Sequence, residues 1–436
     1  MTPGPPQRHT RQRLSSTLQR IPRRSQSAAE PLAPEEASPI SARPRPRGRW
    51  LRYLGLVPVT FVLVIWLDGW VNRLPPLAGV PAPGERVGVI HVHTNASCGS
   101  GSLPQVIEAA RDADLSFLAV TDHNLAESEA EVAAADPPEF AVIDGEEVST
   151  SSGHFLALGI SSRWLRGSSY DARSLMASAR QAGAVNFIAH PYGLKDRWGD
   201  WSVKDFDGME IWNDDAIWRH NSVLAILTSL ILYPVNPRLA LVRLASTPRE
   251  NLAKWDELLA QRPVAGICGS DAHASLRVND RQIARFPSYL SVFSLIRQHL
   301  LLEGQGAVEN GQTSVDALLA ALKNGNAFCA VDALYPADGF TQKVITAGRT
   351  AGPGQSISWS PGAVLHVSVP AGADRPIIRV LRDGREIAQR QTHVLDLTLP
   401  GAGLYRTEAY LRQPGLSGWH RQTLWIFANP VHVTTQ

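Results

Sequence analysis

Residues Ile90–Gly101 read "IHVHTNASCGSG" and place two histidines on either side of one valine, directly after an apolar run. In an extended strand, residues i and i+2 point to the same side, so His91 and His93 can both reach a single ion. Cys98 follows His93 by five residues and offers a thiol in the same neighbourhood. A lone His-x-His pair is more often a surface or hydrogen-bonded feature, so a metal site requires further ligands elsewhere in the chain.

Further potential ligands fall next to short apolar runs. Seven such runs ("RVGVI", "LSFLAV", "FAVI", "HFLALGI", "AVNFIA", "GMEIW" and "VAGICGS") alternate with amphipathic segments that carry helix caps. This alternation is typical of a parallel sheet, either open or closed into a barrel. The histidines and carboxylates at or near the ends of these runs are His91, His93, Asp122, His123, Glu146, Glu147, His154, His190, Glu210, Asp271 and His273.

The positions of these residues predict one shared cavity. In parallel barrels the loops after the strands converge on one face, which carries the active site. Burial of so many ionisable groups without a metal would leave them unpaired, at a cost of several kcal/mol each. A histidine-rich set with carboxylates and one thiol suits Zn²⁺, with Mn²⁺ or Fe²⁺ as alternatives.

These motifs resemble a known family. "HVHTNAS", "AVTDHN", "GEEVS…GHFLALG", "AHP" and "GSDAH" are similar, in this order, to the motifs of the PHP (polymerase and histidinol phosphatase) superfamily. "EIWN", "WDELLA" and "YRTEAYLR…ANPVHV" look like features of its carbaryl-hydrolase-like branch. The resemblance implies a distorted (β/α)7 barrel that holds two or three divalent metal ions.

The resemblance also implies roles for the ligands. The first ion would be held by His91, His93, Glu147 and Asp271. Glu147 would bridge to a second ion bound by His154 and His190, while His123 and His273 would face a third. Glu147 is preferred to Glu146 because the family pattern is Gly-x-Glu.

Four residues stay open between alternatives. Cys98 stands where related proteins often carry an acid that binds the third ion, so it is either a thiolate ligand or a packing residue, and the number of ions is two or three. Asp122 is expected to orient a ligand histidine, or to act as an acid/base group. Glu210 and Asn213 either line the cavity or make strand-end hydrogen bonds.

The predicted function is that of a metal-dependent hydrolase. A metal-bridging hydroxide would attack phosphorus or a carbonyl carbon, and His123 or His273 could protonate the leaving group if the third ion is absent. The family resemblance favours phosphoesters, and the branch admits carbamates, amides or carboxylic esters. A catalytically silent, metal-loaded binding module is the alternative from another functional class.

Charge limits the partners of the protein. Residues 1–52 carry eleven arginines against three glutamates, which leaves 31 basic and 37 acidic residues, or about −6, for the rest of the chain. The folded part therefore lacks the excess of positive charge that nucleic-acid binding requires, and a small molecule is the expected substrate.

The N-terminal region predicts a membrane anchor. We expect a disordered basic tail over 1–52, a transmembrane helix over 53–71 and a linker over 72–86. Arginines before the apolar run predict a cytoplasmic N-terminus and an extracytoplasmic catalytic domain. A signal-peptide core and a buried soluble helix are the alternatives.

The remaining predictions concern packing. The metallohydrolase barrel should cover 87–335, and the short alternating runs over 339–436 indicate an all-β, sandwich-like domain that packs against it or borders the substrate. The apolar segment Val223–Pro234 is expected in the core. Cys268 and Cys329 lie in apolar runs and are expected to act as small buried hydrophobes, because three cysteines make no disulfide framework.

Overall fold

The computed structural model describes residues 56–77, 81–126, 140–160, 169–278, 281–302, 308–309, 312–415 and 420–435. The predicted tail over 1–52 lies outside the described residues, as do the first residues of the predicted anchor.

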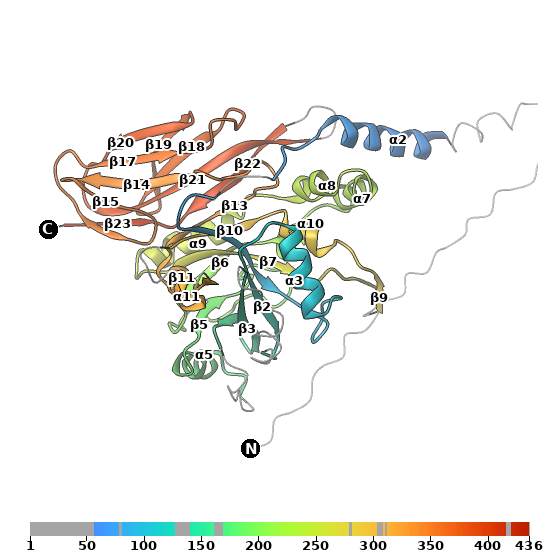
Figure 1. Ribbon diagram of the computed structural model, residues 1–436, viewed down its shortest axis with the longest axis horizontal. Coiled ribbons are helices and arrows are strands. Elements are labelled where there is room, and N and C mark those ends of the chain that lie inside the picture. The colour runs from blue at the N-terminus through green and yellow to red at the C-terminus, as the bar shows by residue number, and fades with distance from the viewer. Residues whose placement is uncertain are drawn as a thin grey trace, which may run out of the picture. The chain divides into compact units, whose positions relative to one another are not determined.

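Seven consecutive strands close into a barrel, because β1 pairs with β7 as well as with β2 (Figure 1). All neighbouring pairs are parallel except those of β4, which runs antiparallel to β3 and β5. The first residues of β4 therefore lie at the same barrel mouth as the carboxyl ends of the other strands. The barrel strands are β1 (Glu85–Val92), β2 (Phe117–His123), β3 (Ala141–Thr150), β4 (Gly153–Leu158), β5 (Val185–Ile188), β6 (Gly208–Asn213) and β7 (Ala265–Ala272).

Helices cover the outside of the barrel, and side-chain hydrogen bonds cap the first turns of two of them. Asp171 caps its helix by accepting a hydrogen bond from the Ser174 amide at 2.8 Å, while the Ser102 amide donates to Gln105. The helices of this region are α3 (Leu103–Asp112), α5 (Ala172–Gln181), α6 (Asp214–Arg219), α7 (Val223–Leu232), α8 (Pro237–Leu244), α9 (Arg249–Leu259), α10 (Tyr289–Phe293) and α11 (Val315–Asn324).

The barrel sheet continues into the C-terminal strands. β10 (Arg297–Leu301) pairs with β1, β13 (Ala327–Ala330) pairs with β10, and β22 (His420–Ala428) pairs with β13. The further strands of this sheet are β16 (Ser356–Ser358), β18 (Ile377–Arg382), β19 (Arg385–Gln391), β21 (Gly403–Pro414) and β23 (Val431–Thr434).

A second sheet lies against these C-terminal strands, and buried side chains of both sheets belong to one apolar cluster. Its strands are β14 (Thr341–Thr346), β15 (Arg349–Ala351), β17 (Val364–Ser368) and β20 (Val394–Thr398). Two small hairpins complete the described strands: β8 (Leu276–Val278) with β9 (Arg281–Ala284), and β11 (Val308–Glu309) with β12 (Gln312–Thr313). The structure thus has the expected barrel and β domain, while the boundary between them near residues 335–339 stays a prediction.

The cysteine prediction was wrong in one respect. Cys268 in β7 and Cys329 in β13 are buried as expected, but they form a disulfide across 61 residues of sequence. Their pairing depends on β10, which places β13 beside the barrel, and the spacing of the two residues contains no sign of this.

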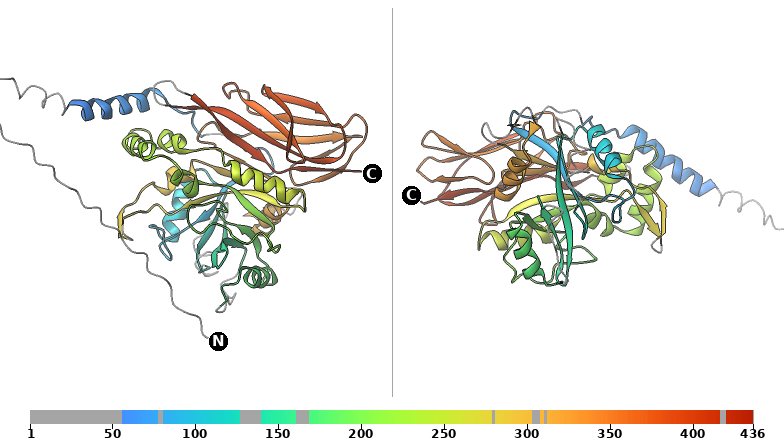
Figure 2. Two further views of the ribbon diagram at one scale, coloured as in Figure 1. Left: turned by 180° about the vertical axis from the view of Figure 1, so that it is seen from behind. Right: turned by 60° about the horizontal axis from the view of Figure 1, so that its bottom comes forward.

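The predicted transmembrane helix is not found. Of its residues, those that the structure describes form α2 (Leu56–Val71), and no helix of the described residues is long and apolar enough to cross a membrane. α2 instead packs along α7, where Ile65 and Leu232 are fully buried, and Asp68 forms an ion pair with Arg243 of α8 at 2.5 Å. Figure 2 shows α2 next to α7 and α8.

The assignment of Val223–Pro234 to the core was also wrong. α7 lies on the surface, and Val223, Leu224 and Leu227 are 74%, 66% and 51% exposed. An apolar sequence by itself does not distinguish a helix inside a domain from one that presents apolar side chains outward.

Candidate metal centre

The first strand ends in an irregular backbone at His91. Its φ is 65°, and the register of β1 against both neighbours shifts at this point. His190 and Asp271 also have positive φ values, which are uncommon outside glycine and tend to gather at functional sites. The side chains of His91 and His93 converge as the sequence indicates, but through a bulge that re-aims His91 rather than through a regular extended strand.

The first group of ligand atoms contains His91, His93, Glu147 and Asp271, and all four residues are buried. Oε2 of Glu147 lies 3.1 Å from Nε2 of His91 and 3.2 Å from Nε2 of His93. Oδ1 of Asp271 lies 3.4 Å and 3.2 Å from the same two nitrogens. The four atoms thus surround one point, in the combination that the resemblance implies for the first ion.

The hydrogen-bonding state of this group tests whether a metal ion fits. Among the described residues, Nε2 of His91, Nε2 of His93 and Oε2 of Glu147 are buried without a hydrogen-bond partner. Buried polar atoms normally have partners, but these three converge on one another without forming a hydrogen bond. A divalent cation accepts lone pairs from all of them at once, so the residues fit a metal.

The electrostatics of the first group also favour a metal cation. Burial lowers the pKa of His91, but the carboxylates of Asp271, Glu210 and Glu147 raise it well above its ordinary value. Burial raises the pKa of Glu147, but the charge of His91 and hydrogen bonds from His154 and His190 hold it well below its usual range. The acidic side chains thus create a strongly negative potential, which a proton or a metal cation can neutralise.

A second group forms around the other oxygen of Glu147. Oε1 lies 2.7 Å from Nδ1 of His154 and 2.9 Å from Nε2 of His190, while Nδ1 of His123 is 3.1 Å from Oε2. His154 is the second residue of the antiparallel strand β4, so the reversal of β4 brings it to the ligand-bearing mouth. The rings of His91 and His190 have centroids 5.7 Å apart, which joins the second group to the first.

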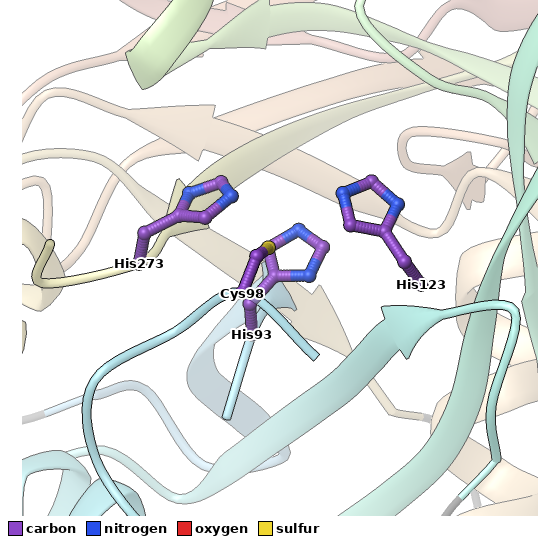
Figure 3. Close-up of side chains that lie close together, drawn as sticks. All are labelled: His93, Cys98, His123 and His273. Atoms are coloured by element: carbon purple, nitrogen blue, oxygen red, sulfur yellow. The ribbon is translucent and has the colours of Figure 1, made fainter. Parts of the chain in front are cut away.

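A third group contains His93, Cys98, His123 and His273, whose ligand atoms lie within 4.8 Å of one another. In Figure 3 the rings of His123 and His273 lie on opposite sides of Cys98 and His93. Burial raises the pKa of the Cys98 thiol, but hydrogen bonds from His123, His273 and His93 lower it to about 3. The thiolate is therefore the stable form of Cys98, and a thiolate is the form that ligates metals.

Two residues that the sequence left between alternatives lie behind the first group. Glu210 is fully buried, and its Oε1 lies 2.7 Å from Nδ1 of His91, while its Oε2 accepts from the His190 amide at 2.6 Å. Nδ2 of Asn213 donates to Glu210 at 2.9 Å and to Asp271 at 3.2 Å. A carboxylate on the far nitrogen of a ligand histidine fixes the ring and its tautomer.

Asp122 has a different setting from the one predicted. One carboxylate oxygen accepts from the Thr94 amide and from the Ser97 hydroxyl, and the other accepts from the Thr94 hydroxyl at 2.6 Å. Asp122 thus holds the loop that carries Cys98, and Glu210 rather than Asp122 is the carboxylate bonded to the His91 ring. The nearness of Asp122 to the loop depends on the pairing of β1 with β2, which the sequence around Asp122 does not reveal.

Tyr289 is a residue that sequence reasoning missed. Its hydroxyl donates to the carbonyl oxygen of His93 at 2.7 Å and receives the Ser100 amide at 3.2 Å. It therefore fixes both ends of the loop around Cys98. Tyr289 is the first residue of the short helix α10 and has no motif beside it, so no local signal could have identified it.

Comparison with known proteins gives structural likenesses only. No family model matches the sequence, and the search of curated proteins finds no match. A two-domain protein from Bacteroides vulgatus with a predicted PHP-like metal-dependent phosphoesterase matches with 12% identity and a TM-score of 0.39, over 81% of this chain and 99% of its own. A candidate metal-dependent phosphoesterase from Bifidobacterium adolescentis matches with 16% identity and a TM-score of 0.30, over 43% of this chain and 87% of its own. An amidohydrolase from Chromobacterium violaceum, with bound sulfate and no metal, matches with 17% identity and a TM-score of 0.29, over the same shares.

Proposed function

We propose that the protein is a metal-dependent hydrolase that cleaves phosphoesters with two or three divalent ions. The observation that supports this most directly is the sharing of ligands. Glu147 belongs to the first and second groups of ligand atoms, and His93 belongs to the first and third. Shared ligands would hold neighbouring ions a few ångströms apart, which is the spacing of sites that act on both sides of a displacement.

The ions, when bound, would activate a water molecule and take up the negative charge that develops on the substrate. Glu147 and Asp271 would supply the anionic ligands, and Glu210 would keep the His91 ring oriented. His123 and His273 are the more exposed members of the ligand groups and border the cavity beside them, so either could deliver a proton to the leaving oxygen where it is not bound to metal.

Phosphoesters are favoured over the alternatives by the extent of the site. A phosphoryl group in transfer spreads charge over several oxygens, and three adjoining ligand groups can accommodate ions on more than one of them. Cys98 favours Zn²⁺ in the third group, since thiolate ligands suit zinc better than manganese. Carbamate, amide and carboxylic ester hydrolysis, and silent binding, remain the alternatives for the test.

The test uses the full-length protein with Zn²⁺, Mn²⁺ or Fe²⁺. A phosphodiester, a phosphomonoester and an aryl carbamate are compared, together with the variants Glu147→Gln and, as a matched control on an exposed carboxylate, Glu257→Gln. We expect metal-dependent phosphoester turnover that Glu147→Gln abolishes and Glu257→Gln retains. Turnover of the carbamate alone would contradict the phosphoesterase proposal and indicate a carbamate hydrolase. Metal binding without turnover of any of the three substrates would support the catalytically silent binding module.

We also propose an extracytoplasmic location for the barrel. The disulfide between Cys268 and Cys329 supports it, because such bonds persist in oxidising compartments. Protease accessibility in intact cells and in cells with a permeabilised membrane tests this location. Cleavage only after permeabilisation of the innermost membrane would contradict it.

A further inference from the structure

A cavity of about 580 Å³ lies beside the candidate metal centre and extends away from it. Cys98, His123, Asp271 and His273 border one part of it. The part among α6, α7 and α8 is lined mainly by the apolar side chains of Ile217, Ile226, Leu230, Tyr233, Leu241 and Leu244. Asp215 and Arg219 of α6 also line the cavity and form an ion pair with each other at 2.5 Å. This apolar extension is much larger than a phosphoryl group requires, and apolar lining binds apolar ligand surface.

The helix that walls this cavity is apolar on both sides. Ile226 and Leu230 of α7 face the cavity, while Val223, Leu224 and Leu227 are exposed on the outer surface. A helix with apolar residues around its circumference is stable inside a protein core or in a lipid environment. α7 is on the surface, so its outer face requires an apolar partner.

A second apolar helix lies beside α7. The indole nitrogen of Trp66 in α2 donates to the carbonyl oxygen of Ile231 at 2.8 Å, and Asn236 after α7 donates to the carbonyl oxygen of Gly69 at 2.9 Å. The outward residues of α2 include Leu63, Leu67 and Trp70, which are 56%, 61% and 63% exposed. Together α2 and α7 present far more apolar surface than scattered single residues do.

Charge next to α2 identifies the partner. The ten-residue segment 43–52, which precedes α2 in the sequence, contains five arginines: Arg43, Arg45, Arg47, Arg49 and Arg52. Basic residues adjoining an apolar helix bind anionic lipid head groups while the apolar side chains enter the bilayer boundary. A protein partner would not require this combination of charge and bare apolar surface.

We propose that the substrate is an amphiphilic phosphoester, whose apolar chain occupies the cavity beneath α7, and that α2 and α7 lie on an anionic bilayer from which it enters. This inference rests on the proposed phosphoesterase function. In hydrolysis the water oxygen forms a bond to phosphorus, the ester P–O bond breaks with its electron pair on the leaving oxygen, and a proton from water ends on that oxygen. The products are the alcohol or phenol and the shorter phosphate ester.

The cavity is tested with alkyl 4-nitrophenyl phosphodiesters in solution, from methyl to dodecyl, with the full-length, metal-loaded protein. We expect kcat/KM to rise with chain length, by up to about fourfold per methylene until the cavity is filled. Ile226→Trp, which narrows the cavity, should lower the ratio of kcat/KM for the dodecyl ester to kcat/KM for the methyl ester at least tenfold. Val394→Trp, at an exposed position of β20 outside the cavity and the proposed lipid surface, is the control and should leave both values unchanged.

The outcomes separate this inference from the proposed function. Equal turnover of methyl and dodecyl esters would overturn the inference and leave the phosphoesterase proposal intact. If no ester is turned over, calorimetry with dodecyl phosphate and methyl phosphate still tests the inference. If the cavity binds the alkyl chain, dodecyl phosphate should bind at least tenfold more tightly than methyl phosphate. Equal affinities would overturn the inference.

The lipid surface is tested by sedimentation of the full-length protein with phosphatidylcholine vesicles, with and without phosphatidylglycerol. We expect binding that increases with phosphatidylglycerol and falls severalfold in the double variant Leu224→Glu/Leu227→Glu. Val394→Glu, at an exposed position of β20, is the control and should bind like the wild type. Unchanged binding of the double variant would show that α7 is not part of the surface and would overturn this part of the proposal.

Discussion

Nδ1 of His91 lies 2.7 Å from Oε1 of Glu210, and both side chains are fully buried. The same carboxylate accepts the amide of His190 through its other oxygen. Glu210 thus fixes two ligand histidines from different strand ends. It binds Nδ1 of the His91 ring, while Nε2 on the other side of the ring faces the ligand group. The organisation of the metal centre therefore depends on a residue that need not touch a metal.

The Glu210→Gln variant should bind metal more weakly by about 10–100-fold, because an amide holds the His91 ring less firmly and does not raise its basicity. Titration with a competing chelator and elemental analysis measure this change. Wild-type metal affinity in the variant would mean that Glu210 serves packing alone. Thermal unfolding of both proteins shows whether any loss is simply a loss of fold.

The Cys98→Ser variant should carry about one metal ion fewer per chain than the wild type, because a serine hydroxyl is a poor replacement for a thiolate on zinc. Elemental analysis of both proteins, loaded with Zn²⁺ under the same conditions, provides the comparison. Cys98→Asp should retain the third ion, since a carboxylate is also an anionic ligand. Equal metal contents in wild type and Cys98→Ser would assign Cys98 to packing.

Stability should fall as the pH rises from about 6.5 to about 9, in part through His299. Burial lowers the pKa of His299, but the carboxylates of Asp332 and Glu85 raise it to about 9. The folded state therefore holds a proton that the unfolded chain releases near pH 6.5, so the stabilisation is complete below that pH and is lost towards pH 9, by at most about 3 kcal/mol.

The comparison for this effect is His299→Gln, measured by thermal unfolding at several pH values. The variant should be less stable at pH 6, because His299 also stacks on Phe328 with ring centroids 4.4 Å apart. Its melting temperature should vary less between pH 6.5 and 9 than that of the wild type. Parallel pH profiles would exclude His299 as the source.

Loss of the disulfide should destabilise the protein by about 2–4 kcal/mol, because the bond closes a long loop and restricts the unfolded chain. The double variant Cys268→Ala/Cys329→Ala should unfold at a lower temperature than the wild type. A phosphine reductant should lower the wild-type transition and leave that of the variant in place. Alkylation of the unfolded, unreduced wild type should modify Cys98 alone. Modification of all three cysteines would show that the disulfide between Cys268 and Cys329 is absent.

The sequence by itself determined the ligand inventory and the type of fold. His91, His93, Glu147, His190 and Asp271 lie beside apolar runs, and the alternation of runs and helices predicts strands whose ends meet. This inference works because hydrophobic periodicity and helix caps are local properties of the chain. The family resemblance then supplied the grouping of these residues.

Tertiary structure alone decided the details that depend on distant contacts. The bulge at His91, the bond from Glu210 and the anchoring of the loop by Tyr289 and Asp122 follow from which strands become neighbours. The disulfide and the exposure of α2 and α7 follow from the same cause. Apolar composition predicts that a segment avoids water but not what covers it, since burial is a property of the packed structure rather than of the segment.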